Sequence, residues 1–278
     1  MNEYMNWIQG FFFGLISGLS EFMPLSSRAH QRLFGELFDV PADDPVMLLF
    51  VHAALIASLY FGFRPVIDQL KRNQSTLRQT GVRRRQNRTQ ADIRVVKNAA
   101  VPMIIGMFIL AFVVGNKISL PFVSLFLIIN GVIIYLPERL IRANKDASAM
   151  SYFDSLLIGT FSSLCVIPGF SGIGIASSVA MLRGGDRQKA LQWSLFLLFP
   201  VLATSVCTDL ISIFTYSGGV PFFSALLGYI FAFIGAFISG YLTIKLIRII
   251  TLRSSYAVFA YYSWGMALFL FLLYLTVV

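Results

Sequence analysis

Long apolar runs are the feature that most constrains the fold of this chain. Two of them, "MLLFVHAALIASLYFGF" and "WGMALFLFLLYLTVV", approach the ~20 residues with which a helix crosses a bilayer. The runs are continuous, whereas the strands of a membrane barrel alternate. Hydrophobic residues make up 57% of the chain, compared with about 45–50% in soluble domains. The sequence therefore predicts an all-α polytopic membrane protein.

The polar connectors between the runs predict the orientation of the spans. Ten of the 22 basic residues lie in the connector 64–97, which we interpret as a basic cytoplasmic loop. Anionic lipid headgroups are an expected contact of this loop, and nucleic acid is not an expected partner. The connectors "DVPADDP", "GNKIS" and "TYSGGVP" carry little positive charge and are expected outside. The six expected spans are residues 46–63, 98–115, 120–140, 190–212, 222–248 and 256–278, and the other cytoplasmic connectors are 139–145, 183–189 and 245–253.

Two further segments, 6–37 and 153–182, do not read as simple spans. Each carries a proline in mid-segment, with glycines and serines around it. If both crossed the membrane once, the basic connectors would not all lie on one side. We therefore predict two re-entrant helical hairpins, the first entering from outside and the second from the cytoplasm.

The two hairpins also resemble each other in sequence. "GLISGLSEFMP" and "GTFSSLCVIP" share a glycine, a serine three positions later and then a leucine, and each ends in the proline. Residues 1–140 and 141–278 would each hold one hairpin and three spans within one integral-membrane domain. Their opposite orientations predict an inverted-topology repeat, which places a binding site near the bilayer midplane. A chance similarity of two short glycine- and serine-rich segments is the alternative.

The first hairpin carries reactive side chains around its proline. A helix that restarts after Pro24, capped by Ser26 or Ser27, places Ser27 and His30 on one face. This is the relationship of a nucleophile to its general base. Glu21 is expected to orient His30 or to hold a cation, since a carboxylate within a membrane segment marks function.

Arg28 adds a fixed positive charge that suits phosphate oxygens. The alternative is that Arg28 reaches a lipid headgroup and that the serines bond their own backbone.

The second hairpin contains "PGFSGIGIASS", where a helix can restart at Ser171. Gly169 and Gly172 would let the backbone approach an anion closely, and a helix N-terminus favours phosphate. Small residues are also common in membrane helix contacts, and that alternative stays open. His52 stands alone on an apolar span, where we interpret it as a packing or hydrogen-bonding histidine with a site role left open.

The pair "SEFMPLSSRAH" and "IPGFSGIG" resembles the two signature motifs of the undecaprenyl-diphosphate phosphatase family, the bacitracin-resistance proteins. The resemblance runs essentially full length and includes "LLFVHAALIASLYFGFRP" and "ALQWSLFLLFPVLATSVCTDL". It implies six spans with two re-entrant hairpins, an active site that opens outward, and hydrolysis of undecaprenyl diphosphate to the monophosphate carrier of cell-wall synthesis. It assigns Glu21, Ser26, Ser27 and His30 to the first motif, and Pro168, Gly169 and Ser171 to the second.

The chain departs from the family pattern at three places. Ser17 stands where the family has a second acidic residue, Gly172 where it has an arginine, and Arg28 with Ala29 where it has a "TG" pair. The first change weakens a divalent cation site and the second removes a phosphate clamp. We hypothesise that Arg28 supplies the missing charge from the opposite hairpin.

Two functions follow from these residues. The first is an integral-membrane phosphatase of polyprenyl diphosphate in the bacterial inner membrane. In it Ser27, His30 and Glu21 are catalytic, Ser26, Arg28, Ser171, Gly169 and Gly172 bind phosphate, and Glu21 assists with Mg²⁺ or Ca²⁺. The second is a non-catalytic transporter or flippase of a lipid-linked phosphate, which Ser17 and Gly172 favour. Polyprenyl diphosphate and membrane lipids are the expected partners, and a homodimer is left open.

Overall fold

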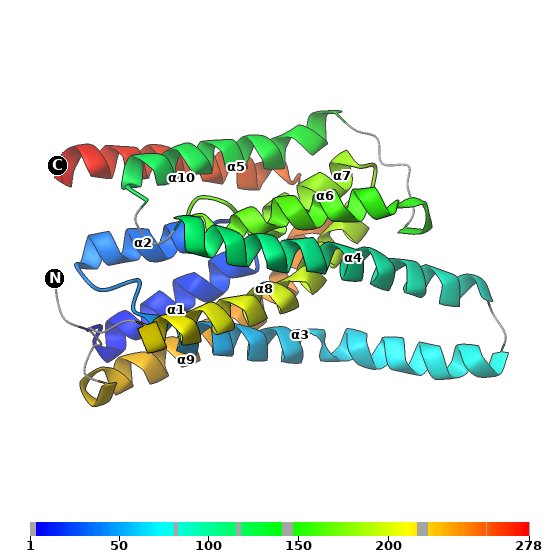
Figure 1. Ribbon diagram of the computed structural model, residues 1–278, viewed down its shortest axis with the longest axis horizontal. Coiled ribbons are helices and arrows are strands. Elements are labelled where there is room, and N and C mark those ends of the chain that lie inside the picture. The colour runs from blue at the N-terminus through cyan, green and yellow to red at the C-terminus, as the bar shows by residue number, and fades with distance from the viewer. Residues whose placement is uncertain are drawn as a thin grey trace.

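The computed structural model describes residues 4–80, 83–114, 118–140, 147–215, 222–253 and 255–277, and these residues form helices without strands. The helices pack into an elongated bundle with both chain termini at one end (Figure 1). Their bounds are α1 Trp7–Glu21, α2 Ser27–Phe38, α3 Pro45–Thr80, α4 Arg83–Val114, α5 Leu120–Leu140, α6 Tyr152–Ser162, α7 Gly172–Leu182, α8 Arg187–Thr215, α9 Phe222–Arg253 and α10 Ala257–Val277, with short 3₁₀ turns at Ala147–Ala149 and Ser163–Val166.

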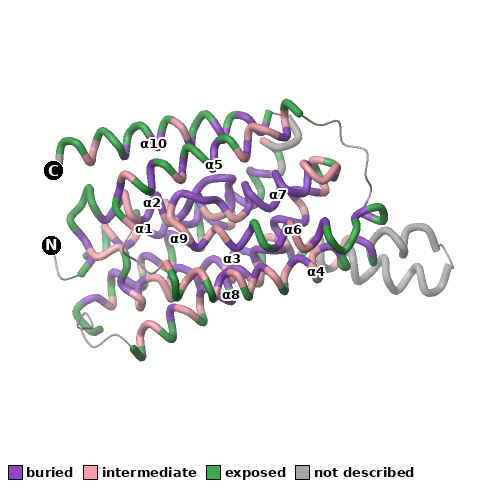
Figure 2. Tube along the Cα trace, turned by 45° about the horizontal axis from the view of Figure 1, so that its top comes forward, coloured by how far each residue is buried: buried purple, intermediate pink, exposed green. Residues whose placement is uncertain are grey.

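Six of these helices are long and apolar enough to cross a membrane, which confirms the six predicted spans. Their outer faces carry large apolar side chains, such as Phe122 on α5, which is 57% exposed. Buried residues concentrate at the centre of the bundle (Figure 2). Apolar outer faces of this extent suit lipid contact, and the chain is a multi-pass membrane protein. The spans are Pro45–Arg64, Gln90–Val114, Leu120–Leu140, Arg187–Thr215, Phe222–Ile247 and Ala257–Thr276.

The basic connector 64–97 differs from the expected loop. Helix α3 continues to Thr80 and α4 begins at Arg83, so two helices extend well beyond the apolar part of the bundle (Figure 1). The stretch is rich in Arg and Gln, whose unbranched side chains favour helix. The high polarity of this segment excludes a membrane span, but it does not exclude a helix. Side chains of residues 69–89 lie outside the described part of the chain.

The segments predicted as hairpins form the short helices α1, α2, α6 and α7. Helix α1 has 15 residues and so measures about 22 Å, shorter than the ~30 Å hydrocarbon core of a bilayer. The α1–α2 and α6–α7 turns both lie in the middle of the bundle (Figure 1). Helix α1 packs on α9 as α6 packs on α4, so corresponding helices of the two halves have corresponding partners. Re-entry into the bilayer and the inverted repeat stay predictions.

A stripe of glycines brings α1 against α9. A Cβ atom at Gly14 would overlap the backbone oxygen of Ala232 and lie 2.8 Å from the nitrogen of Ala236. Gly10 and Gly18 meet the α9 backbone in the same way. Small residues at this spacing let two membrane helices approach closely, so α9 holds the first hairpin in place.

Candidate active site

One serine caps the second helix of each hairpin, as predicted. Ser26 caps α2, and its Oγ accepts the Ala29 N–H at 3.3 Å. Ser171 caps α7, and its Oγ accepts the Gly174 N–H at 3.1 Å. In each hairpin a proline two or three positions earlier ends the preceding segment. The predicted helix restarts are therefore confirmed.

Hydrogen bonds join the two hairpin turns directly. The Gly169 N–H donates to Ser26 Oγ at 2.9 Å, and the Ser171 hydroxyl donates to the Met23 carbonyl at 3.5 Å. Gly169 has φ +112°, and a Cβ atom there would lie 2.5 Å from Phe126 Cβ. Only glycine adopts this backbone in so narrow a space. The structure thus joins residues 143 positions apart in sequence into one central junction.

Asn130 on α5 supports this junction and was missed from the sequence. It is completely buried. Its Oδ1 accepts the Ser171 N–H at 2.9 Å, and its Nδ2 donates to Ser263 Oγ at 3.3 Å. A buried amide in a span is a signal of a polar partner, but the sequence does not show which residue that partner is.

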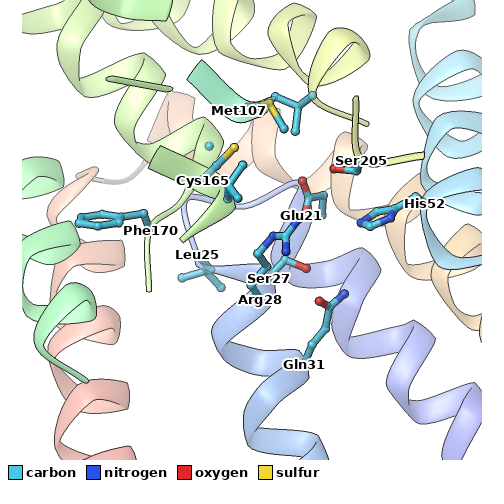
Figure 3. A pocket seen from close by; sticks show the side chains of 13 residues that line it. Glu21, Leu25, Ser27, Arg28, Gln31, His52, Met107, Cys165, Phe170 and Ser205 are labelled. Atoms are coloured by element: carbon cyan, nitrogen blue, oxygen red, sulfur yellow. The ribbon is translucent and has the colours of Figure 1, made fainter. Parts of the chain in front are cut away.

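A small pocket lies beside the junction (Figure 3). Glu21, Ser27 and Arg28 project into it together with Gln31 and His52. The Ser27 hydroxyl is buried and makes no hydrogen bond to any described residue. The Glu21 carboxylate lies within electrostatic reach of His52 and Arg28 and also interacts with the Ser27 hydroxyl, beyond the length of a normal hydrogen bond. The pocket is lined by Glu21, Leu25, Ser27, Arg28, Gln31, His52, Met107, Cys165, Val166, Phe170, Gly172, Val201 and Ser205.

His30 lies outside this pocket lining, although it is close to Ser27 in sequence. Its Nδ1 is 2.6 Å from the Ser26 carbonyl oxygen and its Nε2 is 2.7 Å from the Tyr262 hydroxyl on α10. The imidazole also stacks on the Tyr262 ring. The structure therefore does not bring Ser27 and His30 together in the predicted hydrogen bond, because both ring nitrogens have other partners.

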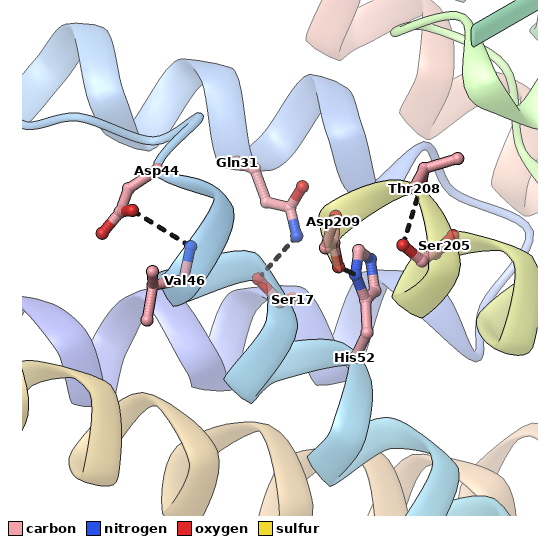
Figure 4. Close-up of polar contacts among 8 residues, drawn as sticks. All are labelled: Ser17, Gln31, Asp44, Val46, His52, Ser205, Thr208 and Asp209. Carbon is pink, nitrogen blue, oxygen red and sulfur yellow. Dashed lines mark hydrogen bonds and ion pairs between the residues drawn. The ribbon is translucent and has the colours of Figure 1, made fainter. Parts of the chain in front are cut away.

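Ser17 and Gln31 form a pair behind the pocket (Figure 4). The Gln31 amide donates to Ser17 Oγ at 3.1 Å, and the Ser17 hydroxyl donates to the Phe13 carbonyl at 2.8 Å. Gln31 lines the pocket, and sequence reasoning missed it. A neutral hydroxyl and amide thus occupy the region where the resemblance implies a second carboxylate.

His52 on α3 is bonded to Asp209 on α8, with Nδ1 2.6 Å from Oδ2 (Figure 4). Both side chains are buried. The interpretation of His52 as a hydrogen-bonding histidine is confirmed, and its ring also lines the pocket. Asp209 was missed, although a carboxylate within an apolar span is itself a signal of function.

The predicted site residues therefore fall into two sets. Glu21, Ser27, Arg28, Gly172 and His52 line the pocket. The others are not part of its lining: Ser26, Ser171 and Gly169 join the two turns, His30 binds Tyr262, and Ser17 binds Gln31.

The pocket offers few ligands to a divalent cation. Glu21 is the one carboxylate of its described lining, and Asp209 is engaged by His52. Within the described ranges, no cluster of three His, Cys, Asp or Glu side chains is placed to hold a metal ion. A Mg²⁺ or Ca²⁺ ion would need most of its oxygen ligands from substrate and water. The divalent cation stays a prediction.

Comparison with known proteins decides the family. A family model described as "Bacitracin resistance protein BacA" matches residues 10–269. The chain belongs to the bacitracin resistance protein BacA family. A relative from Halothermothrix orenii named undecaprenyl-diphosphatase is 30% identical, with 94% of this chain and 96% of the relative covered. Relatives of the same name from Carboxydothermus hydrogenoformans and Methanobrevibacter smithii are 25% and 28% identical. The matched range includes both hairpin turns, so the BacA resemblance predicted from the two motifs is confirmed.

Proposed function

We propose that this BacA family member is an integral-membrane phosphatase that hydrolyses undecaprenyl diphosphate to the monophosphate. The observation that carries the proposal is the buried Ser27 hydroxyl, which lines a polar pocket beside Glu21 and has no hydrogen bond of normal length to a described residue. A buried unpaired hydroxyl costs free energy, and a substrate phosphate would remove that cost. The names of the relatives support the same substrate.

The proposed reaction proceeds through the Ser27 oxygen. Ser27 Oγ bonds to the terminal phosphorus, the bond from that phosphorus to the bridging oxygen breaks, and undecaprenyl monophosphate leaves with the electron pair. Water then cleaves the phosphoserine and releases inorganic phosphate. Phosphoryl transfer of this kind depends mainly on positioning and charge stabilisation. Arg28 and the N-terminus of α7 at Gly172 supply positive charge beside Ser27.

A second cavity supports a route to this pocket. It lies along α2 and the α2–α3 connection, where Arg32, Glu36 and Asp43 line it. Arg28 and Gln31 line both cavities, so the two are neighbours across these side chains. We propose that the diphosphate enters through this cavity. Residues 39–45 are predicted to be external, so the entrance would face the outside of the bacterial inner membrane.

Phosphate release from undecaprenyl diphosphate by purified protein tests the proposal. Ser27→Ala is the control, because it removes the nucleophile. We expect release by the wild type and a decrease of at least ~10²-fold in the variant. Parallel assays with EDTA test the cation: loss of activity that Mg²⁺ or Ca²⁺ restores would support it, and unchanged activity would oppose it.

The alternative function is a transporter or flippase of a lipid-linked phosphate. Ser17 and Gly172 favour it, because both replace charged residues that the family resemblance implies. Binding of undecaprenyl phosphate together with wild-type phosphate release no greater than that of Ser27→Ala would support the transporter and reject the phosphatase.

A further inference from the structure

A hydrogen-bonded pair of a buried histidine and a buried aspartate adjoins the pocket. The two residues come from the spans α3 and α8 and lie outside the two hairpin motifs. His52 and Asp209 are 7% and 6% exposed, and they join α3 to α8. An ionised carboxylate accepts hydrogen bonds and does not donate them. The Nδ1 atom of His52, at 2.6 Å from Asp209 Oδ2, is therefore the protonated one in the neutral ring. The lone pair is then on Nε2.

The Nε2 side of the ring has no competing partner. No described residue forms a hydrogen bond to His52 Nε2, and the ring projects into the same pocket as Glu21 and Ser27 (Figure 3). The Ser27 hydroxyl likewise makes no hydrogen bond of normal length in the described part of the chain, although it interacts with the Glu21 carboxylate. A proton acceptor and a proton donor thus share one small pocket.

His30 offers a different geometry. Its two nitrogens are held by the Ser26 carbonyl and the Tyr262 hydroxyl, and its ring lies against α10 rather than against the pocket. Neither His30 nitrogen is available to Ser27 without breaking one of these bonds.

We propose that His52, oriented by Asp209, is the general base of this site, an inference that rests on the proposed phosphatase function. His52 Nε2 takes the Ser27 proton while Oγ bonds to the terminal phosphorus. The imidazolium then returns that proton to the leaving bridging oxygen. In the second step Nε2 takes a proton from the attacking water and passes it to Ser27 Oγ as phosphate departs. The sum is one diphosphate and one water converted to monophosphate and phosphate.

Two carboxylates near His52 fit this role. Asp209 fixes the tautomer and stabilises the imidazolium that forms, as the acid of a Ser-His-Asp triad does. Glu21 lies within electrostatic reach of the ring and of Arg28. His52 is thus the catalytic residue and Asp209 the positioning residue.

His52→Gln and Asp209→Asn test the proposal in detergent-purified full-length protein. Both replacements retain a polar partner for the remaining side chain, so folding should persist. We expect kcat for undecaprenyl diphosphate to fall by about 10²- to 10⁴-fold in His52→Gln, with KM changed only a few-fold. Asp92→Asn is the matched control, because Asp92 accepts bonds from Lys189 and Trp193 of the same helix α8 at 2.7 and 2.9 Å. It should keep wild-type kcat.

Rescue by imidazole separates a chemical role from a structural one. We expect added imidazole to restore part of the activity of His52→Ala and to leave Ser27→Ala inactive. Wild-type kcat in both His52→Gln and Asp209→Asn would overturn the proposal, as would loss of activity in His52→Ala that imidazole does not restore. Absence of phosphate release by the wild type itself would instead reject the phosphatase function.

Discussion

Ser26 and Ser27 are adjacent, yet the structure gives them different environments. Ser26 Oγ accepts the N–H groups of Ala29 and Gly169. Ser26→Ala therefore removes a helix cap and leaves a buried N–H unpaired, at a cost of about 1–3 kcal/mol. We expect the melting temperature of purified Ser26→Ala to fall, as measured by intrinsic fluorescence. An unchanged melting temperature would mean that the two turns do not need this bond.

Ser27→Ala should show the opposite pattern. Ser27 Oγ has no hydrogen bond of normal length within the described residues and interacts only with Glu21 at longer range, so its removal costs little stability. We expect an unchanged melting temperature and a turnover at least ~10²-fold lower. Measuring the melting temperature and the turnover of both variants distinguishes the nucleophile, Ser27, from the helix cap, Ser26. If turnover decreases only in the variant whose melting temperature decreases, the assignment of Ser27 as the nucleophile is wrong.

Arg28 carries the hypothesis that a charge from the first hairpin replaces one absent from the second. Arg28 and Gly172 line the same pocket. A Cβ atom at position 172 would lie 3.3 Å from Cys165 Cβ, so a side chain there needs only a small shift of its neighbour. We expect Arg28→Ala to lower kcat/KM by roughly 10- to 150-fold through loss of a charge-assisted bond. Gly172→Arg should restore activity in that background.

The full double-mutant cycle shows whether Arg28 binds the substrate phosphate or only contacts lipid headgroups. Coupled effects of Arg28→Ala and Gly172→Arg are expected if one clamp suffices. Additive effects, or a silent Arg28→Ala, would show that Arg28 serves only the lipid interface.

At the scale of elements, the contact of α1 with α9 depends on glycine. Gly14→Val would drive a side chain into the α9 backbone at Ala232. Overpacking costs about 1–3 kcal/mol, and here it would displace the hairpin that carries Glu21 and Ser27. We expect a lower melting temperature and lower activity. Gly265→Val on α10 is the control, since no described atom lies within 4 Å of a Cβ there. Equal melting temperatures in both variants would contradict the close contact.

The sequence predicted correctly those helices whose position depends on a local residue pattern. Continuous apolar runs predicted the six spans, and a proline followed by serine predicted the starts of α2 and α7. It failed where the cause is a contact between distant residues. His52 and Asp209 are 157 positions apart, and the Tyr262 partner of His30 is 232 positions away. Spacing placed His30 beside Ser27 on a helix, but the contact of His30 with Tyr262 appears only when α10 is packed against α2.

At the scale of the whole molecule, charge and bundle geometry predict one orientation in the membrane. The turn before α3 and the start of α8 lie at opposite ends of the bundle (Figure 1). Near Gln188 the chain carries Arg183, Arg187 and Lys189, whereas Asp43 stands in an acidic turn, so the positive-inside rule predicts that Gln188 faces the cytoplasm. Cysteine at 43 or 188, in a chain with Cys165 and Cys207 replaced by alanine, reports the two ends. We expect an impermeant maleimide to label position 43 in intact cells and position 188 only after permeabilisation. The reverse pattern would turn the cavity at Asp43 toward the cytoplasm and reject entry of the diphosphate from outside.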